Sequence, residues 1–307
     1  MKYSVIIPTK DRKAILEKTL GCIKSVNNIK DLEVVIVNDS DTNLDVDLSL
    51  FPTSFQMLQN PGSGVAAAKN FGASKAMNEW LIFMDDDILV KPSTFENLPA
   101  YYEHKNWCSN INWVYPDFII NQRNFNPFVR YLNKYQFDSL KGWSNNPDWN
   151  DHKIFRVQSV SSQFLVIHKS EFEAVGGYNE RFPLAGFEDH DMSVRLDNLG
   201  AEMFLDPTNV VYHNEEDRIV LENWLERKRR GAITRKVAVD LGYDTLRLTY
   251  SGLKKAFYTI VFASRKYMLS VLNKWPQTKI LDPVYFFLVN VLLGAYSYSG
   301  YTKEMSD

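Results

Sequence analysis

The sequence predicts an α/β protein with a mainly parallel central sheet flanked by helices, followed by an appended C-terminal helical region. Over the first ninety residues, short β-branched runs alternate with stretches whose apolar residues recur at helical spacing. The strand-like runs VVIV and LIFM are continuously apolar, which is typical of parallel strands buried on both faces. A shift to basic, helix-forming composition from about residue 222 indicates the appended region.

The first elements follow in the order strand, helix, strand, then turn, helix, strand. The strands are expected at residues 3–8, 32–39 and 79–86, the helices at 13–26 and 65–77, and the turn at 60–64. This order predicts βαβ units and therefore parallel pairing.

The middle of the chain, residues 100–155, is rich in Trp, Tyr, Phe and Asn. It is interpreted either as a packed insertion or as a sugar-binding wall on the acceptor side. Beyond it we expect a strand at 157–169, a short helix at 171–177, a helix with an acidic first turn at 188–200 and a strand pair at 201–213. The expected domains are residues 1–221, with this insertion, and residues 222–307.

Composition narrows the class of protein. The chain has 307 residues, 45% of them hydrophobic, and a net charge of -2, which provides no global basic field for nucleic acid. Cys22 and Cys108 lie far apart without metal-ligand spacing, so a disulfide framework or zinc site has little support. The apolar run in MKYSVIIPT is too short for a signal peptide. We therefore expect a cytoplasmic protein.

Three adjacent acids, Asp85, Asp86 and Asp87, directly follow a predicted strand. Because they repel one another, a positive partner is expected, and Mg²⁺ or Mn²⁺ takes carboxylates together with substrate phosphates. Aspartate before a helix can merely cap it, but three in succession favour a metal site. His213 ends the later run VVYH; alone it would more often be structural, but at the same sheet edge it would complete a mostly oxygen-based Mn²⁺ site.

Polar residues also follow the two earlier strands, and ligands of parallel sheets lie beyond the carboxyl ends of the strands. These residues are Pro8, Thr9, Asp11, Arg12, Asn38 and Asp39. Gly62 and Gly64 precede the AAAKN run, where small residues allow close approach of a nucleotide, and Lys69 supplies a charge for phosphate. The pattern is neither a Walker A loop nor GxGxxG, which speaks against P-loop and dinucleotide chemistry.

Glu188, Asp189 and Asp191 cluster at a predicted helix start. Acids there are stabilised by the helix dipole, which is a sufficient structural explanation. The functional alternative is a carboxylate base that removes a proton from an incoming hydroxyl. Such a base would lie near the cation without being its ligand.

The ordered motifs VIIPTKDR, LEVVIVNDS, NPGSGVAAAKNFGASKA, WLIFMDDDI, VGGYNERF, FEDHDMSVRL and VVYH resemble the family 2 glycosyltransferases over about residues 2–215. The resemblance implies the GT-A nucleotide-diphospho-sugar transferase fold and inversion at the anomeric carbon. It also implies residue roles, with a DXD motif at residues 85–87 for metal and diphosphate. The donor residues so expected are Pro8, Thr9, Asp11, Arg12, Asp39, Gly64, Lys69, Asp85 and Asp86.

Within that resemblance, Asp39 is expected to meet a uracil-like edge, and Lys69 stands where the family commonly has arginine. The late histidine of the family, here His213, can join the metal beside Asp85, Asp86 and Asp87. Asp189 matches the catalytic base, and Glu188 is its nearest substitute. These assignments come from the matched motifs.

The C-terminal region contains two apolar segments, at about 253–273 and 283–299. The first interleaves Lys and Arg with apolar residues, as in an interfacial helix on anionic lipid. The second, about seventeen residues with Asn290 and Gly294 inside, is marginal for spanning a bilayer. Peripheral attachment to the inner face of the membrane or a homo-oligomer interface is favoured, and a pair of core helices covering the sheet is the alternative.

The leading hypothesis is a metal-dependent inverting glycosyltransferase in surface polysaccharide synthesis. Its expected partners are a nucleotide-sugar donor, with UDP favoured, and a glycan or lipid-linked acceptor. One alternative is a sugar nucleotidyltransferase, although VIIPTKDR lacks the glycines typical of its phosphate loop. The other is a non-catalytic scaffold that binds nucleotide sugar without turnover.

Overall fold

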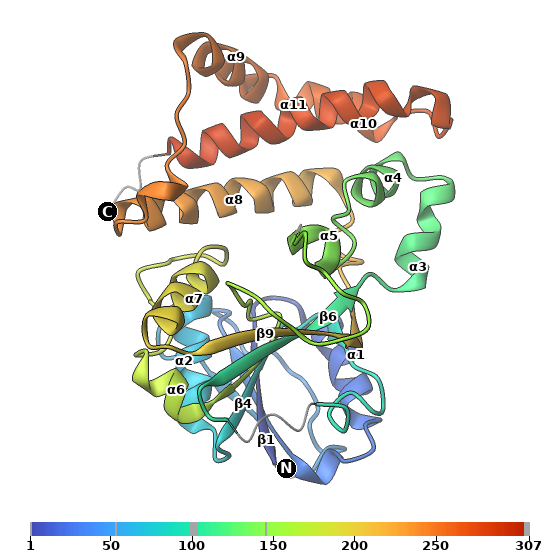
Figure 1. The fold of residues 1–307 in the computed structure, drawn as a ribbon. Coiled ribbons are helices and arrows are strands. Elements are labelled where there is room, and N and C mark those ends of the chain that lie inside the picture. Colours follow the sequence, from blue (N-terminus) through green and yellow to red (C-terminus); the bar gives the residue numbers. More distant parts are fainter. Residues whose placement is uncertain (1, 53, 99–103, 145, 304–307) are drawn as a thin grey trace. The chain divides into compact units, whose positions relative to one another are not determined.

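The computed structural model describes residues 2–52, 54–98, 104–144 and 146–303, and the chain divides into two compact units (Figure 1). The first unit comprises Met1–Tyr115, Ser139–Pro183 and Glu188–Asn214. The second comprises Pro116–Asp138, Leu184–Phe187 and Glu215–Asp307. The assignment of residues 222–307 to a domain of their own remains a proposal.

The first unit is built on a nine-stranded sheet with the strand order β3-β2-β1-β4-β8-β6-β9-β5, and β7 pairs with β9. Its strands are β1 Tyr3–Thr9, β2 Leu32–Asn38, β3 Phe55–Gln59, β4 Trp80–Met84, β5 Ile88–Leu89, β6 Trp107–Val114, β7 Phe155–Arg156, β8 Phe164–His168 and β9 Glu202–His213.

Strand direction determines at which edge of the sheet the polar residues that follow the strands lie. Strands β3, β2, β1 and β4 are mutually parallel, β8 is antiparallel to both β4 and β6, and β9 is parallel to β6. It follows that β6 and β9 run in the same direction as β1, β2 and β4. The carboxyl ends of β1, β2, β4 and β9 therefore lie at one edge of the sheet.

Helices cover both faces of this sheet, with α2, α6 and α7 on one side and α1 on the other (Figure 1). The helices of the first unit are α1 Lys13–Lys24, α2 Val65–Lys75, α5 Leu140–Ser144, α6 Lys169–Ala174 and α7 Glu188–Asn198. Ile6 and Phe83 of the sheet pack with Phe172 of α6 and Leu196 of α7 in one buried cluster. The predicted α/β class, a central sheet flanked by helices, is confirmed.

Four strands, β3, β5, β6 and β7, escape the sequence prediction, and β5 and β7 have two residues each. In β6, the apolar pattern is interrupted by Ser109 and Asn110, which are buried. Asn110 belongs there because its side-chain amide donates to the carbonyl oxygens of Ser161 and Phe164, at 2.7 and 2.8 Å. The strand pair predicted at 201–213 is one strand, β9; its pairing with β6 shifts register between Ile111 and Asn112.

The aromatic middle of the chain is largely packed. Trp113 is buried in the first unit, and Phe128 and Tyr131 are buried in the second. Trp143, by contrast, is 53% exposed. The packed interpretation therefore describes most of these rings, and Trp143 and Phe125 are among those that are exposed.

The second unit is helical, and its helices are α3 Asp117–Ile120, α4 Pro127–Lys134, α8 Leu221–Asp240, α9 Gly252–Ala263, α10 Arg265–Asn273 and α11 Asp282–Tyr301. Helix α11 packs against α8, α9 and α4. Among the described residues, Lys279–Tyr301 is the one helical stretch that by length and composition could cross a membrane.

Helix α11 carries the marks of a packed helix. Its Asn290 accepts a hydrogen bond from the Tyr131 hydroxyl at 2.8 Å. A Cβ at Gly294 would lie 2.7 Å from the Tyr258 ring of α9, and a Cβ at Gly300 would overlap the Arg229 carbonyl oxygen of α8. The polar and small residues that interrupt this apolar segment are therefore explained by contacts within the second unit.

Replacing Gly300 with alanine is expected to destabilise the second unit by about 1–3 kcal/mol, because the added methyl collides with backbone that has little room to move. Gly231, also at a helical position in this unit, has open space around it. Gly231→Ala is the matched control and is expected to be neutral or stabilising by up to ~1 kcal/mol. Denaturant unfolding midpoints measure both; equal midpoints for the two variants would contradict the packing described.

Candidate functional site

Two carboxylates and an imidazole meet at the carboxyl edge of the sheet. Asp85, Asp87 and His213 each offer one ligand atom, and these atoms all lie within 4.8 Å of one another. The register explains the meeting: Ile88 of β5 pairs with His213 of β9, which puts Asp87 beside the histidine. Asp87 Oδ1 lies 3.2 Å from His213 Nε2, and the Asn214 N–H donates to the Asp87 carbonyl at 2.7 Å.

This donor set suits a hard divalent cation. Carboxylate oxygens with one imidazole nitrogen fit Mn²⁺ or Mg²⁺, whereas no cysteine contributes to the group, which disfavours a soft-metal site. Asp87 is fully buried and His213 is 5% exposed, so protein rather than solvent fixes both side chains. Asp85, Asp87 and His213 would hold the cation.

Asp86 lies outside this group of three and has other partners. Its Oδ2 accepts a hydrogen bond from Thr9 Oγ1 at 2.7 Å, and its Oδ1 is paired with the Arg12 guanidinium. Arg12 Nη1 also lies 2.9 Å from Asp87 Oδ2. Arg12 thus supplies part of the positive charge that the adjacent acids require.

The predicted nucleotide-side residues lie around Asp39, just beyond β2. Asp39 Oδ1 accepts hydrogen bonds from the Asn60 amide at 2.7 Å and from the Gly64 N–H at 3.0 Å. Gly64 has φ +90°, and a Cβ there would lie 3.3 Å from the Pro183 carbonyl oxygen. Both the backbone conformation and the limited space at this position therefore favour glycine. The Asp39 N–H donates to the Thr9 carbonyl at 2.8 Å, which joins the ends of β1 and β2.

Two further residues predicted to contact the donor, Pro8 and Asp11, lie at the end of β1 and in the turn after it. Pro8 is part of β1, in register with Val37 of β2. Asp11 follows β1 with φ 55°, and its N–H donates to Ser40 Oγ at 2.7 Å. The turn after β1 is therefore fastened to the turn after β2.

A second group of acids surrounds Lys69 of α2. Its Nζ lies 3.1 Å from Glu188 Oε1 and 3.7 Å from Asp189 Oδ1, at the start of α7. It also donates to Ser162 Oγ and lies 4.5 Å from the centre of the Tyr178 ring. Burial alone would lower the Lys69 pKa, but the neighbouring acids outweigh it and raise the pKa to about 12. The lysine therefore stays charged.

The two acids differ in exposure. Glu188 is 2% exposed and held by Lys69, whereas the Asp189 side chain is 21% exposed. Burial raises the Asp189 pKa to about 6 against the opposing charge of Lys69, and Glu188 raises it further. A partly accessible carboxylate with a pKa near neutrality has the properties of a general base.

The two groups are joined by the segment that leads into β8. Ser162 Oγ donates to Asp189 Oδ2 at 3.2 Å, and the carbonyl of the next residue, Gln163, accepts the Asp85 N–H at 3.1 Å. Asp85 is also close enough to contribute to the raised pKa of Lys69. The group of Asp85, Asp87 and His213 and the pair Glu188 and Asp189 therefore form one site.

Sequence reasoning missed Ser162, Gln163 and Tyr178 as parts of this site. The signal for the first two is the polar run SSQ immediately before a strand. Because β8 is antiparallel to its neighbours, its amino end lies at the edge where they end. The rule that ligands lie beyond the carboxyl ends of strands therefore does not identify the residues before β8.

A sheet of this topology, with carboxylates and an imidazole at its carboxyl edge, defines the class of GT-A-fold glycosyltransferases. The chain belongs to the family described as Glycosyl transferase family 2, whose family model matches residues 4–164. The predicted family and fold are both confirmed.

Known proteins of this class resemble the chain at low identity. The pre-mycofactocin glycosyltransferase of Mycobacterium tuberculosis is 26% identical over 230 residues, which cover 73% of this chain and 45% of the relative. The chain spans about half the length of that curated relative.

Two solved structures share the fold. The mannosyltransferase PcManGT from Pyrobaculum calidifontis, solved with GDP-Man and Mn²⁺, gives a TM-score of 0.57 at 14% identity over 99% of this chain and 88% of its own. GalNAc-T7, solved with UDP, GalNAc and Mn²⁺, gives 0.54 at 16% identity over 69% and 43%.

Proposed function

We propose that this protein is a metal-dependent inverting glycosyltransferase. It transfers a sugar from a nucleotide-diphosphate donor to a hydroxyl of a glycan or lipid-linked acceptor, in surface polysaccharide synthesis on the cytoplasmic side of the membrane. The observation that carries the proposal is the single site in which Asp189 lies with the group Asp85, Asp87 and His213. The Mn²⁺ in both solved neighbours supports metal dependence.

In this mechanism Asp189 accepts the proton of the acceptor hydroxyl. The acceptor oxygen forms a bond to the anomeric carbon from the face opposite the diphosphate, while the bond from that carbon to the diphosphate oxygen breaks. The electron pair leaves with the diphosphate, and the sugar configuration inverts. A divalent cation, when bound, neutralises the charge that grows on this leaving group.

The remaining residues position these groups. Lys69 holds Glu188 and, through Ser162, the carboxylate of Asp189, so that the base faces one direction. Arg12 and Thr9 hold Asp86 and thereby fix the turn from which Asp85 and Asp87 extend. A direct contact of Lys69 with phosphate, as implied by the resemblance, remains a prediction.

The donor is proposed to be a UDP-sugar, because Asp39 matches the residue that meets uracil in the family. PcManGT was solved with GDP-Man, so both nucleotides belong in the test. Thermal denaturation with UDP-sugars and GDP-sugars plus Mn²⁺ is expected to show a higher melting temperature with UDP-sugars, since a bound ligand stabilises the folded form. Stabilisation by GDP-sugars alone would overturn the donor assignment, and none by either would overturn the proposed function.

Transfer is expected to rise with pH between about pH 5 and pH 7, with half-maximal kcat/KM near the Asp189 pKa of about 6. The base works only when deprotonated, so acid abolishes its action. A profile of kcat/KM that is flat across this range would contradict the role of Asp189.

The same pKa shift predicts a change in stability. Folding raises the Asp189 pKa, so the stability linked to its proton is present at low pH and is lost as the pH rises through about 6. Asp189→Asn, which carries no ionisable group there, should lose less stability than wild type as pH rises. Melting temperatures of both proteins across this range check the prediction.

Lys69→Met is expected to raise the Asp189 pKa further, because the variant loses the positive charge that opposes the effect of burial. The kcat/KM profile should shift to higher pH. Lys75→Met, at an exposed position of the same helix, is the matched control and should leave the profile unchanged. An unshifted profile in a folded Lys69→Met protein would show that Lys69 does not act on the base.

A further inference from the structure

The second unit exposes an unusual amount of apolar surface on α9, α10 and the start of α11. Sixteen large apolar side chains are exposed in the described part of the chain, and half of them lie between residues 253 and 287. They are Leu253, Phe257, Ile260, Tyr267, Val271, Ile280, Val284 and Phe287. The hydrophobic contacts of the second unit leave this surface uncovered.

On α9 the exposed apolar residues form one stripe. Leu253, Phe257 and Ile260 follow one another at spacings of four and three, and they are 87%, 50% and 69% exposed. Tyr258 holds the helix to α11, since its ring contacts Tyr298 and lies against Gly294. Helix α9 is therefore fastened by one face and presents another, apolar face to the surroundings.

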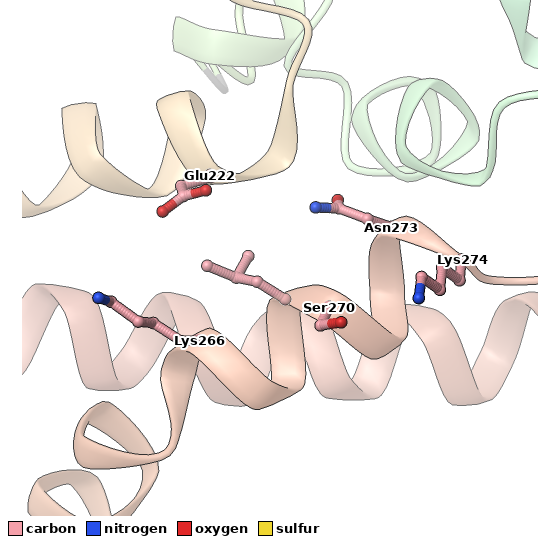
Figure 2. A pocket seen from close by; sticks show the side chains of 6 residues that line it. Glu222, Lys266, Ser270, Asn273 and Lys274 are labelled. Atoms are coloured by element: carbon pink, nitrogen blue, oxygen red, sulfur yellow. The ribbon is translucent and has the colours of Figure 1, made fainter.

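All charged side chains between residues 252 and 281 are basic. Between residues 252 and 281 there is no Asp or Glu, and the basic residues are Lys254, Lys255, Arg265, Lys266, Lys274 and Lys279. The five lysines are exposed. Lys266 and Lys274 lie at opposite ends of a pocket of about 410 Å³, in which Glu222 of α8 is the other charged lining residue (Figure 2).

We propose that the lipid-docking surface, defined as α9, α10 and residues 279–287, binds an anionic lipid bilayer at the level of the headgroups. Apolar side chains on short helices enter the boundary between headgroups and acyl chains, and the flanking lysines contact lipid phosphates. Insertion is shallow, because α11 is packed against α8 and α9.

Charge favours a bilayer over a second copy of the chain. A two-fold interface brings the same patch of both subunits together, and two patches that each carry six basic residues would repel, because Asp282, the one acid among these residues, is paired with Arg130. An anionic bilayer offers opposite charge and an apolar interior in the same surface. The proposal is independent of catalysis, because it concerns residues outside the site of Asp189.

Co-sedimentation of the full chain with phosphatidylcholine vesicles, with and without phosphatidylglycerol, tests the proposal. Wild type is expected to bind the anionic vesicles, more weakly as salt is added. Lys254→Gln/Lys255→Gln should weaken this binding about 25-fold, since each basic residue near the surface contributes roughly a factor of five. Leu253→Ser/Ile260→Ser should weaken it on both kinds of vesicle.

Leu50→Ser/Met77→Ser removes two exposed apolar side chains of the first unit and is the matched control, with binding expected to equal wild type. Circular dichroism and melting temperature establish that each variant is folded. Failure of wild type to bind anionic vesicles, or binding that neither pair of substitutions changes, would overturn the proposal. So would a dimer that the α9 substitutions dissociate in the absence of lipid.

Discussion

Asp189→Asn is expected to lower kcat/KM for sugar transfer by about 10³-fold, within the range of a general base, while nucleotide-sugar binding remains. The amide keeps the shape of the side chain and its contact with Ser162 but cannot accept the acceptor's proton. Steady-state kinetics with a donor found by the binding screen, beside calorimetric titration of that donor, measures both effects.

Asp197→Asn is the matched control because Asp197 is an exposed acid of the same helix, α7. Its kinetics should equal those of wild type. If Asp189→Asn lost donor binding and transfer to the same extent, Asp189 would be a binding residue and the base would lie elsewhere. If it retained full transfer, the proposed mechanism would fail.

Asp87→Asn is expected to weaken Mn²⁺ binding by about 10²-fold or more, because a buried carboxylate of the proposed cation site becomes a neutral amide. Titration of the protein with Mn²⁺ alone measures this without reference to activity. Metal-dependent donor binding should fall with it.

Asp86→Asn provides a contrast within the same turn. Asp86 is held by Thr9 and Arg12 and is not one of the three residues proposed to hold the cation, so its variant should bind Mn²⁺ within a few-fold of wild type. Equal losses in the two variants would show that the turn as a whole, rather than Asp87, holds the cation.

The sequence is most informative about the first half of the sheet. The runs that form β1, β2 and β4 are continuously apolar because both of their faces are covered, and α1 between β1 and β2 shows a clear helical period. Parallel order then places Thr9, Asp39 and Asp85 at one edge. This part of the site follows from strand direction alone.

In the other half, the runs of β8 and β9 are predicted as strands, but β6 and the pairing of these strands could not be predicted from local pattern, because tertiary contacts determine them. Strand β6 contains buried Asn110, whose hydrogen bonds to residues 161 and 164 replace apolar packing. The antiparallel direction of β8 brings Ser162 to the site, and no periodicity reveals that direction. The meeting of His213 with Asp87 depends on the register of β9 against the two-residue strand β5.

The ion-pair and hydrogen-bond partners of the charged residues also could not be predicted from the sequence. Lys69 looks like a surface cation available for phosphate, yet it is 1% exposed and bonded to Ser162 and Glu188. Arg12 looks like one more polar residue after a strand, yet it links Asp86 to Asp87. Such pairings depend on distances that only the folded chain defines.

Release of nucleoside diphosphate from a bound donor, measured in the presence of acceptor during a titration with Mn²⁺, is the most direct check on what this sheet edge does. Wild type should release product in proportion to the cation bound and stop when a chelator is added, whereas Asp189→Asn should bind the donor and release almost none. Product release at the same rate without any divalent cation, or tight donor binding with no turnover in wild type, would contradict the proposed chemistry.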